Sequence, residues 1–221
     1  MDRSRLEAFS DGVFAVAITL LAFDFTIHQT GYGTLAHQLT HDLWPSFLAY
    51  LVSFSMIGII WVNHHVLVRQ IAVVDRTLLF LNLVLLLFVV LIPFATSTVA
   101  TYRLASAGSA GADARVSVVF YAAVFLGMSA GFGAIFEWTL HENRRHQPLP
   151  AEAHWPARIR FVGGAVVYLL SIGVALLNAV AGFVVLALVA VYYIVEHTPQ
   201  PPAPAPAQDE TAGTAGNTTA E

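Results

Sequence analysis

The residues best suited to chemistry lie at the start of an apolar stretch that runs from residue 5 to residue 25 and is long enough to cross a bilayer. Four side chains of charged, polar or aromatic type open this stretch: Arg5, Phe9, Ser10 and Asp11. Ionisable groups are costly inside a membrane, so at the end of a membrane helix they usually mark a functional site or a packing contact. The sequence therefore predicts a functional site or a packing contact at this end of the helix.

The composition indicates which elements must position these residues. The chain of 221 residues is 57% hydrophobic and only 11% charged, which is typical of an integral membrane protein. Six apolar windows approach the length of about 20 residues that a spanning helix needs: 5–27, 46–68, 77–102, 116–140, 159–177 and 180–196. The sequence therefore predicts an all-α membrane protein with six transmembrane helices.

The remaining segments are too short to form a second folded unit. The two longest predicted loops, 28–44 and 141–157, are below the usual size of a globular core. Residues 1–197 are therefore predicted to form one transmembrane domain. Residues 198–221 lack large apolar side chains and are rich in proline and alanine, which predicts a disordered cytoplasmic tail.

The arginines predict the orientation of the chain. Eight of them fall on one side of a six-span arrangement: Arg3, Arg5, Arg69, Arg76, Arg144, Arg145, Arg158 and Arg160. Arg103 and Arg115 fall on the other side. Because cytoplasmic loops are enriched in basic residues, both termini are predicted to be cytoplasmic in a multi-pass protein.

Several classes of function find no support in the residues. Without cysteine, the chain has no thiol catalysis and no thiolate metal site, and no basic patch suggests a nucleic-acid partner. No nucleophile or metal-ligand set indicates an enzyme, and no cofactor is expected. His37 and His41 have a spacing of four residues, but two imidazoles alone are a weak metal signal, so no metal site is predicted.

The first predicted helix carries an apolar stripe on one face. Val16, Leu20, Phe23 and Ile27 are separated by four, three and four residues, and Thr19 lies beside them. Spacing of this kind is typical of a packing surface between helices. It also suits the lining of a pore, so the spacing alone leaves both interpretations open.

The opening residues also carry a resemblance. The pattern R-x-x-x-F-S-D, formed by Arg5, Phe9, Ser10 and Asp11, resembles the signature of the transmembrane protein 175 family of potassium channels. The six-span layout resembles the same family, as do four residues near the inner end of the second predicted helix: Trp61, Asn63, His64 and His65. The resemblance implies a homotetramer in the plasma membrane, surrounded by lipid, that conducts potassium ions through a pore lined by the first helix of each subunit.

The resemblance also implies roles for the stripe. It places the pore constriction at Val16, with Leu20, Phe23 and Ile27 continuing the lining and Thr19 contributing a hydroxyl to ion selectivity. Four copies of each apolar side chain would form rings that close a pore by excluding water. The sequence has no TVGYG segment, so a filter of backbone carbonyls of the ordinary potassium-channel kind is not expected.

Asp11 is expected to pair with the second predicted helix. Arg5 and Asp11 lie six residues apart on different helix faces, so they do not pair with each other. We therefore expect Asn63, His64 and His65 to donate hydrogen bonds to Asp11. An interfacial position at the lipid headgroups is the alternative for the two histidines.

Two further alternatives follow from the ionisable residues. Asp24, near the outer end of the first helix, either concentrates cations at a pore mouth or is a solvated carboxylate. A proton-coupled ion or solute carrier, in which Asp11, His64 and His65 change protonation, is the alternative to a channel. The resemblance makes the potassium-permeable channel the preferred prediction, and the inverted repeats and interrupted helices that usually mark carriers are not evident in the sequence.

Overall fold

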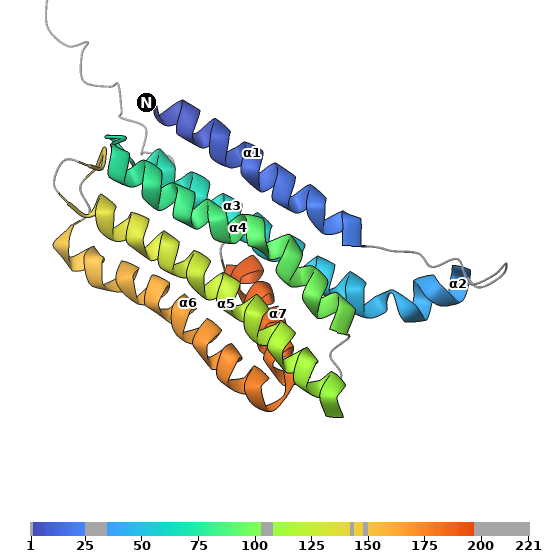
Figure 1. The fold of residues 1–221 in the computed structure, drawn as a ribbon. Coiled ribbons are helices and arrows are strands. Elements are labelled where there is room, and N and C mark those ends of the chain that lie inside the picture. The colour runs from blue at the N-terminus through green and yellow to red at the C-terminus, as the bar shows by residue number, and fades with distance from the viewer. Residues whose placement is uncertain (1, 25–34, 103–107, 142–143, 148–149, 197–221) are drawn as a thin grey trace, which may run out of the picture.

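The described residues form a bundle of long helices. The computed structural model describes residues 2–24, 35–102, 108–141, 144–147 and 150–196. The long helices, coloured from blue to red along the chain in Figure 1, are α1 (Arg3–Leu21), α3 (Trp44–Arg69), α4 (Arg76–Tyr102), α5 (Gly108–Thr139), α6 (Ala151–Leu177) and α7 (Ala179–Glu196). Two short segments, α2 (Leu35–His37) and a π-helical turn (Gln38–Asp42), precede α3. The all-α prediction is confirmed, with one long helix in each predicted window.

The helix boundaries differ from the prediction in three places. α1 ends at Leu21 and continues as a 3-10 turn over Ala22–Asp24, so it is shorter than the window 5–27. α5 begins eight residues before residue 116, and α6 begins at Ala151, inside the predicted loop 141–157. Helices often extend beyond their apolar windows, because backbone hydrogen bonds continue wherever no residue interrupts them. Residues 198–221 lie outside the described part.

Some of the long helices, but not all of them, reach the length and hydropathy of a membrane span within the described residues. Among the described residues, three helical segments are long and apolar enough to cross a bilayer: Ser46–Arg69, Arg76–Tyr102 and Gly111–Thr139. Val162–Leu177 and Ala179–Tyr193 are apolar but shorter. The six spans therefore remain a prediction, although the six helices lie in the predicted order.

α6 and α7 form a tight antiparallel hairpin, in line with the gap of only two residues between the predicted windows 159–177 and 180–196. A single residue, Asn178, joins the two helices, and its side-chain oxygen accepts a hydrogen bond of 3.0 Å from the N–H of Ala181 in the first turn of α7. A Cβ atom at Gly182 would lie 2.5 Å from the Cβ of Ala175, so only glycine permits this close approach.

α4 and α5 form the centre of the bundle, and α1 lies at one edge. α4 packs against α1, α3 and α5, whereas α5 packs against α4, α6 and α7. In Figure 1, α1 and α6 occupy opposite edges of the bundle. Three buried hydroxyls tie the centre together, because Ser53 contacts both Thr96 and Tyr121 at 2.7 Å. In the part of the chain that the structure describes, α1 therefore has neighbouring helices on one side only.

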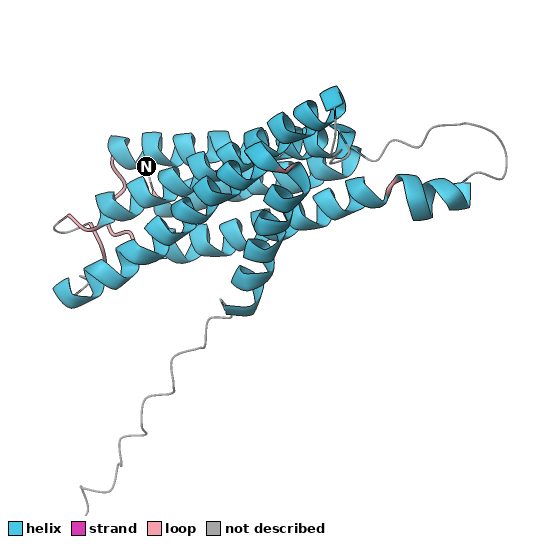
Figure 2. Cartoon of the chain, turned by 90° about the horizontal axis from the view of Figure 1, so that it is seen from below, coloured by secondary structure: helices cyan, strands magenta, loops and turns pink. Residues whose placement is uncertain are grey.

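The loops after α3 and after α5 lie at the end of the bundle where α1 begins, which we call the inner end (Figure 2). There the loop after α3 pairs with the loop after α5: the N–H of Ala72 donates to the carbonyl of Arg144 at 2.8 Å, and Ile71 and Arg145 form an isolated β-bridge. The side chain of Arg144 also lies 3.9 Å from Asp75, which caps α4 by accepting the N–H of Leu78 at 2.8 Å. These contacts hold the two inner loops together as one platform.

Candidate functional site

α1 has one buried face and one exposed face. The buried face consists of five residues at helical spacing: Leu6, Ser10, Phe14, Ala17 and Leu21. This face packs against α3 and α4. The buried positions fix the rotation of α1 about its own axis, and therefore decide which side chains remain exposed.

The exposed face carries the stripe that the sequence singled out. Val16 is 56% exposed, Leu20 42% and Phe23 81%, and Thr19 is exposed between them. Phe9 lies on the same face and is half exposed. Among the described residues these side chains are therefore not part of the core, and the stripe is not a packing surface between the described helices. Ile27 and the side chain of Asp24 lie outside the described part.

Thr19 has a hydroxyl with a fixed orientation. Its O–H donates to the backbone carbonyl of Val16 at 2.8 Å. A hydroxyl has one proton and two lone pairs, so this hydrogen bond leaves lone pairs directed away from the helix backbone. The exposed face of α1 therefore presents an oxygen acceptor between apolar side chains.

The buried face of α1 is anchored by a chain of three polar side chains, the Ser10–Asn82–His64 chain. The Ser10 hydroxyl donates to the carbonyl of Leu6 at 2.9 Å and accepts the amide N–H of Asn82 at 3.0 Å. The amide oxygen of Asn82 in turn contacts Nε2 of His64 at 2.8 Å. Because that oxygen only accepts, Nε2 of His64 is the donor and carries a proton. The chain therefore joins α1, α4 and α3 in a single orientation.

Aromatic rings enclose this chain. The His64 ring lies 5.4 Å from that of Phe14 on α1 and 6.3 Å from that of Phe132 on α5, measured between centroids. His64 is 1% exposed, and Ser10 and Asn82 are also buried. A buried polar group without a partner is costly, so the complete hydrogen bonding of these side chains is a condition of their burial.

Asp11 finds a different partner from the expected ones. Its Oδ1 accepts the indole N–H of Trp61 at 2.8 Å, and the Trp61 ring stacks on His65 with centroids 5.9 Å apart. The expectation that Asn63, His64 and His65 donate to Asp11 was wrong, because the rotation of α3 directs His64 toward Asn82 and places Trp61 opposite the carboxylate. Asn63 and His65 are partly exposed.

The Asp11–Trp61 contact gives a testable expectation. Trp61→Phe keeps an aromatic ring but removes the only donor of that side chain, so the protein should lose about 1 kcal/mol of stability, the net worth of one hydrogen bond. Thermal unfolding in detergent would measure the loss. Trp155→Phe is the matched control, because Trp155 is 69% exposed on α6. Equal transition temperatures for both variants would contradict a structural role for the contact.

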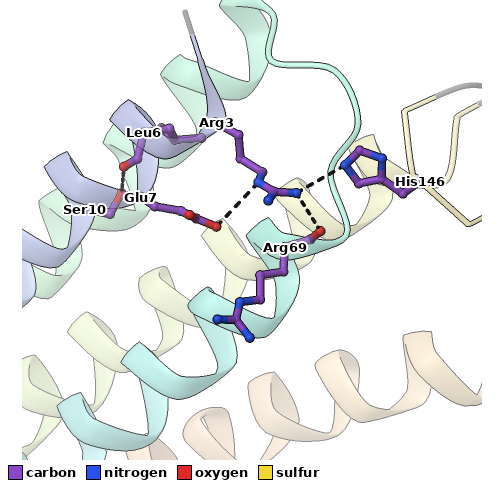
Figure 3. Close-up of polar contacts among 6 residues, drawn as sticks. All are labelled: Arg3, Leu6, Glu7, Ser10, Arg69 and His146. Carbon is purple, nitrogen blue, oxygen red and sulfur yellow. Dashed lines mark hydrogen bonds and ion pairs between the residues drawn. The ribbon is translucent and has the colours of Figure 1, made fainter.

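Sequence reasoning missed two features of this region. Asn82 was not identified, although a single asparagine within the apolar window 77–102 is the signal that marks an intramembrane polar contact. Arg3 was considered only for orientation. Its Nη1 donates to the carbonyl of Arg69 at 3.1 Å and lies 3.2 Å from Nε2 of His146 (Figure 3). The signature residue Arg5 is exposed on α1.

Comparison with known sequences gives matches over nearly the whole chain. Residues 5–93 match the profile of the family described as endosomal/lysosomal potassium channel TMEM175. A Streptomyces collinus protein named as a potassium channel is 39% identical over 202 residues, which cover 90% of this chain and 95% of that protein. A second relative with the same description, from Chamaesiphon minutus, is 36% identical over 65% of this chain and 68% of its own length.

Comparison with solved structures agrees with the sequence matches. The crystal structure of a lysosomal potassium-selective channel TMEM175 homolog from Chamaesiphon minutus superimposes with a TM-score of 0.73 at 29% sequence identity. The superposition covers 87% of this chain and 96% of the other. The helical arrangement described above is therefore shared with that protein.

Proposed function

Because this chain belongs to the transmembrane protein 175 family, we propose that it is a potassium-permeable cation channel whose pore is lined by α1 of each subunit. The family and the apolar helices make it a membrane protein. The names of the two bacterial relatives described above support potassium as the permeant ion. We place the protein in the plasma membrane with six spans and both termini in the cytoplasm, as the arginine distribution predicts.

The observation that carries the proposal is the exposed stripe of α1. A helix at the edge of the bundle that exposes Val16, Leu20 and Phe23 leaves a continuous face for identical copies to meet. Four subunits around an axis would bring four α1 helices together and bury that face, which supports a homotetramer with a central pore.

The chemistry of the stripe suits a gated pore. Rings of Val16 and Leu20 would exclude water when they are narrow, and would conduct when the helices tilt or rotate. The lone pairs of Thr19 would replace part of the hydration shell of a cation between those rings. Asp24, in the turn that follows α1, is proposed to raise the cation concentration at the pore mouth.

Flux into liposomes tests the function directly. Purified protein reconstituted in vesicles is expected to conduct potassium passively, to conduct sodium less well, and to do so without an imposed pH gradient. Flux that requires proton counterflow would instead assign the protein to the carriers. Empty vesicles, and vesicles with heat-denatured protein, are the controls for leak.

A further inference from the structure

Among the described residues, the Arg3 side chain hydrogen-bonds the first turn of α1 to two other elements of the subunit. Arg3 donates through Nη1 to the carbonyl of Arg69, the last residue of α3, at 3.1 Å. The same nitrogen lies 3.2 Å from Nε2 of His146, in the loop between α5 and α6. Figure 3 shows the Arg3 side chain reaching from α1 toward both partners. We call Arg3, His146 and the Arg69 carbonyl the inner latch.

The electrostatics favour Arg3 at this position. The carbonyls at the end of α3 carry the negative partial charge of a helix C-terminus, which attracts a guanidinium. Nε of Arg3 also lies 3.7 Å from Oε1 of Glu7, a buried oxygen that has no hydrogen-bond donor among the described residues. Arg3 therefore balances a buried negative charge on its own helix while it contacts two other elements.

The partners of Arg3 belong to the rigid platform of the two inner loops. The backbone N–H of His146 donates to the carbonyl of Gln70 at 3.0 Å, beside the pairing of Ala72 with Arg144. Arg145 contacts the Gln70 side chain and also donates to the Thr139 hydroxyl at 3.1 Å. α1 itself is tied to this platform by the Arg3 side chain, whereas backbone hydrogen bonds hold the loops to each other.

The latch depends on the protonation of His146. A guanidinium can only donate hydrogen bonds, so the contact at 3.2 Å requires a lone pair on Nε2 and hence a neutral imidazole. Protonation converts that acceptor into a donor and brings two positive charges together. Histidine is the side chain that ordinarily changes charge between about pH 5 and 8, and His146 is exposed to solvent.

The other charges around His146 do not relieve this repulsion. From α1 the facing groups are Arg3 and Glu7, and Glu7 is already beside Arg3. From α3, from the start of α4 and from the loop of His146 itself, the charged groups are Arg69, Asp75, Arg144 and Arg145. Asp75 is engaged by Arg144, and burial lowers the pKa of the Arg145 guanidinium. Among the described residues around the latch, the arginines therefore outnumber the carboxylates.

Movement at the inner latch would reach the pore-lining stripe. Arg3 lies seven residues before Ser10, roughly 10 Å along the helix axis, and Leu20 lies ten residues after it, roughly 15 Å. The Ser10–Asn82–His64 chain holds α1 between these two points. If the inner end of α1 were released, the helix would therefore tilt about Ser10. Release of one end of a stiff helix changes the tilt of the other.

We propose that the inner latch is a proton-sensitive restraint on α1, in which Arg3 is a positioning residue and protonation of His146 from the inner side frees the helix and increases conduction. This inference rests on the proposed channel function. It places the proposed sensitivity to protons at His146, in the loop between α5 and α6.

Current recordings from excised patches, with acid applied to each membrane face in turn, test the proposal. Lowering the pH from about 8 to about 5 at the inner face should raise the potassium current of the natural protein about fivefold, the factor expected for the loss of roughly one net hydrogen bond. His146→Gln retains an acceptor at every pH, so its current should stay low. Arg3→Gln has no latch, so its current should be high at both pH values.

Two matched variants separate the latch from general charge effects. Arg158→Gln removes an exposed arginine on α6 that pairs with Glu137 at 2.6 Å, and it should respond to acid like the natural protein. His141→Gln makes the same exchange as His146→Gln at another exposed histidine of that loop, and it should also keep the response. Absence of potassium current from the natural protein at any pH would overturn the channel assignment itself. A natural current that responds to acid equally in His146→Gln, or that is unchanged in Arg3→Gln, would overturn the latch alone.

Discussion

Replacing Asn82 by leucine is expected to lower the stability of the folded protein strongly, because it breaks two hydrogen bonds in the core of the bundle. The amide of Asn82 donates to Ser10 and accepts from His64, and all three side chains are buried. Leucine has a similar volume but no polar atoms, so it leaves the His64 N–H without an acceptor. Each buried group stranded in this way costs about 1 to 3 kcal/mol. Thermal unfolding of the purified protein in detergent would measure the loss.

A double substitution tests whether the unpaired His64 N–H causes this loss of stability. Removing both partners of a buried hydrogen bond is far less costly than removing one. Asn82→Leu combined with His64→Phe should therefore recover part of the lost stability, because the ring at position 64 already lies between Phe14 and Phe132. Asn63→Leu, the same chemical change at a partly exposed position beside His64, is the control. If the control loses as much stability as Asn82→Leu, the buried chain does not have the importance assigned to it.

Replacing Leu20 by serine is expected to raise the basal potassium flux about tenfold or more. In the proposed tetramer, four Leu20 side chains form an apolar ring, and a hydroxyl at that level would favour water in the narrow pore. A tenfold change corresponds to lowering the barrier by about 1.4 kcal/mol, a small change when four side chains are exchanged together. Flux from preloaded liposomes, normalised to the amount of protein, would measure the effect.

The control for Leu20 is an exposed leucine that is not on α1. Leu188 on α7 is also exposed, so Leu188→Ser makes the same chemical change away from the stripe. It should leave the flux near that of the natural protein. The assignment of Leu20 to the pore lining would be wrong if Leu20→Ser and the natural protein gave equal flux. Native mass spectrometry would show whether the oligomeric state of the variant is unchanged.

The positions of the helices could be predicted because they depend on local sequence. An apolar run of about 20 residues forms a helix wherever it meets lipid, since the backbone must satisfy its own hydrogen bonds there. The tight α6–α7 hairpin also follows from local sequence, since only two residues separate the windows 159–177 and 180–196, and in the structure a single residue separates the two helices. The ends of α1, α5 and α6 were less predictable, because polar residues at a helix end can belong either to its last turn or to the loop.

The polar partners could not be predicted from spacing. His64 and Trp61 are three residues apart on α3, so both point toward the same side of that helix, and a small rotation decides which of them faces Asp11. The sequence suggested the histidine, and the structure has the tryptophan. The contact between Arg3 and His146 could not be predicted either, because the two residues are separated by 143 positions in the sequence.

By itself, the sequence determined the class of protein, the order of its helices, its family, and the apolar stripe on one face of the first helix. All of these depend on composition, on a local motif, or on the fixed period of the α-helix, which any short segment reveals. Only the tertiary structure decided that this stripe is exposed, that Asn82 joins Ser10 to His64, and that Arg3 reaches His146. These contacts depend on how each helix is rotated and displaced against its neighbours, which results from packing over the whole bundle and not from any one segment.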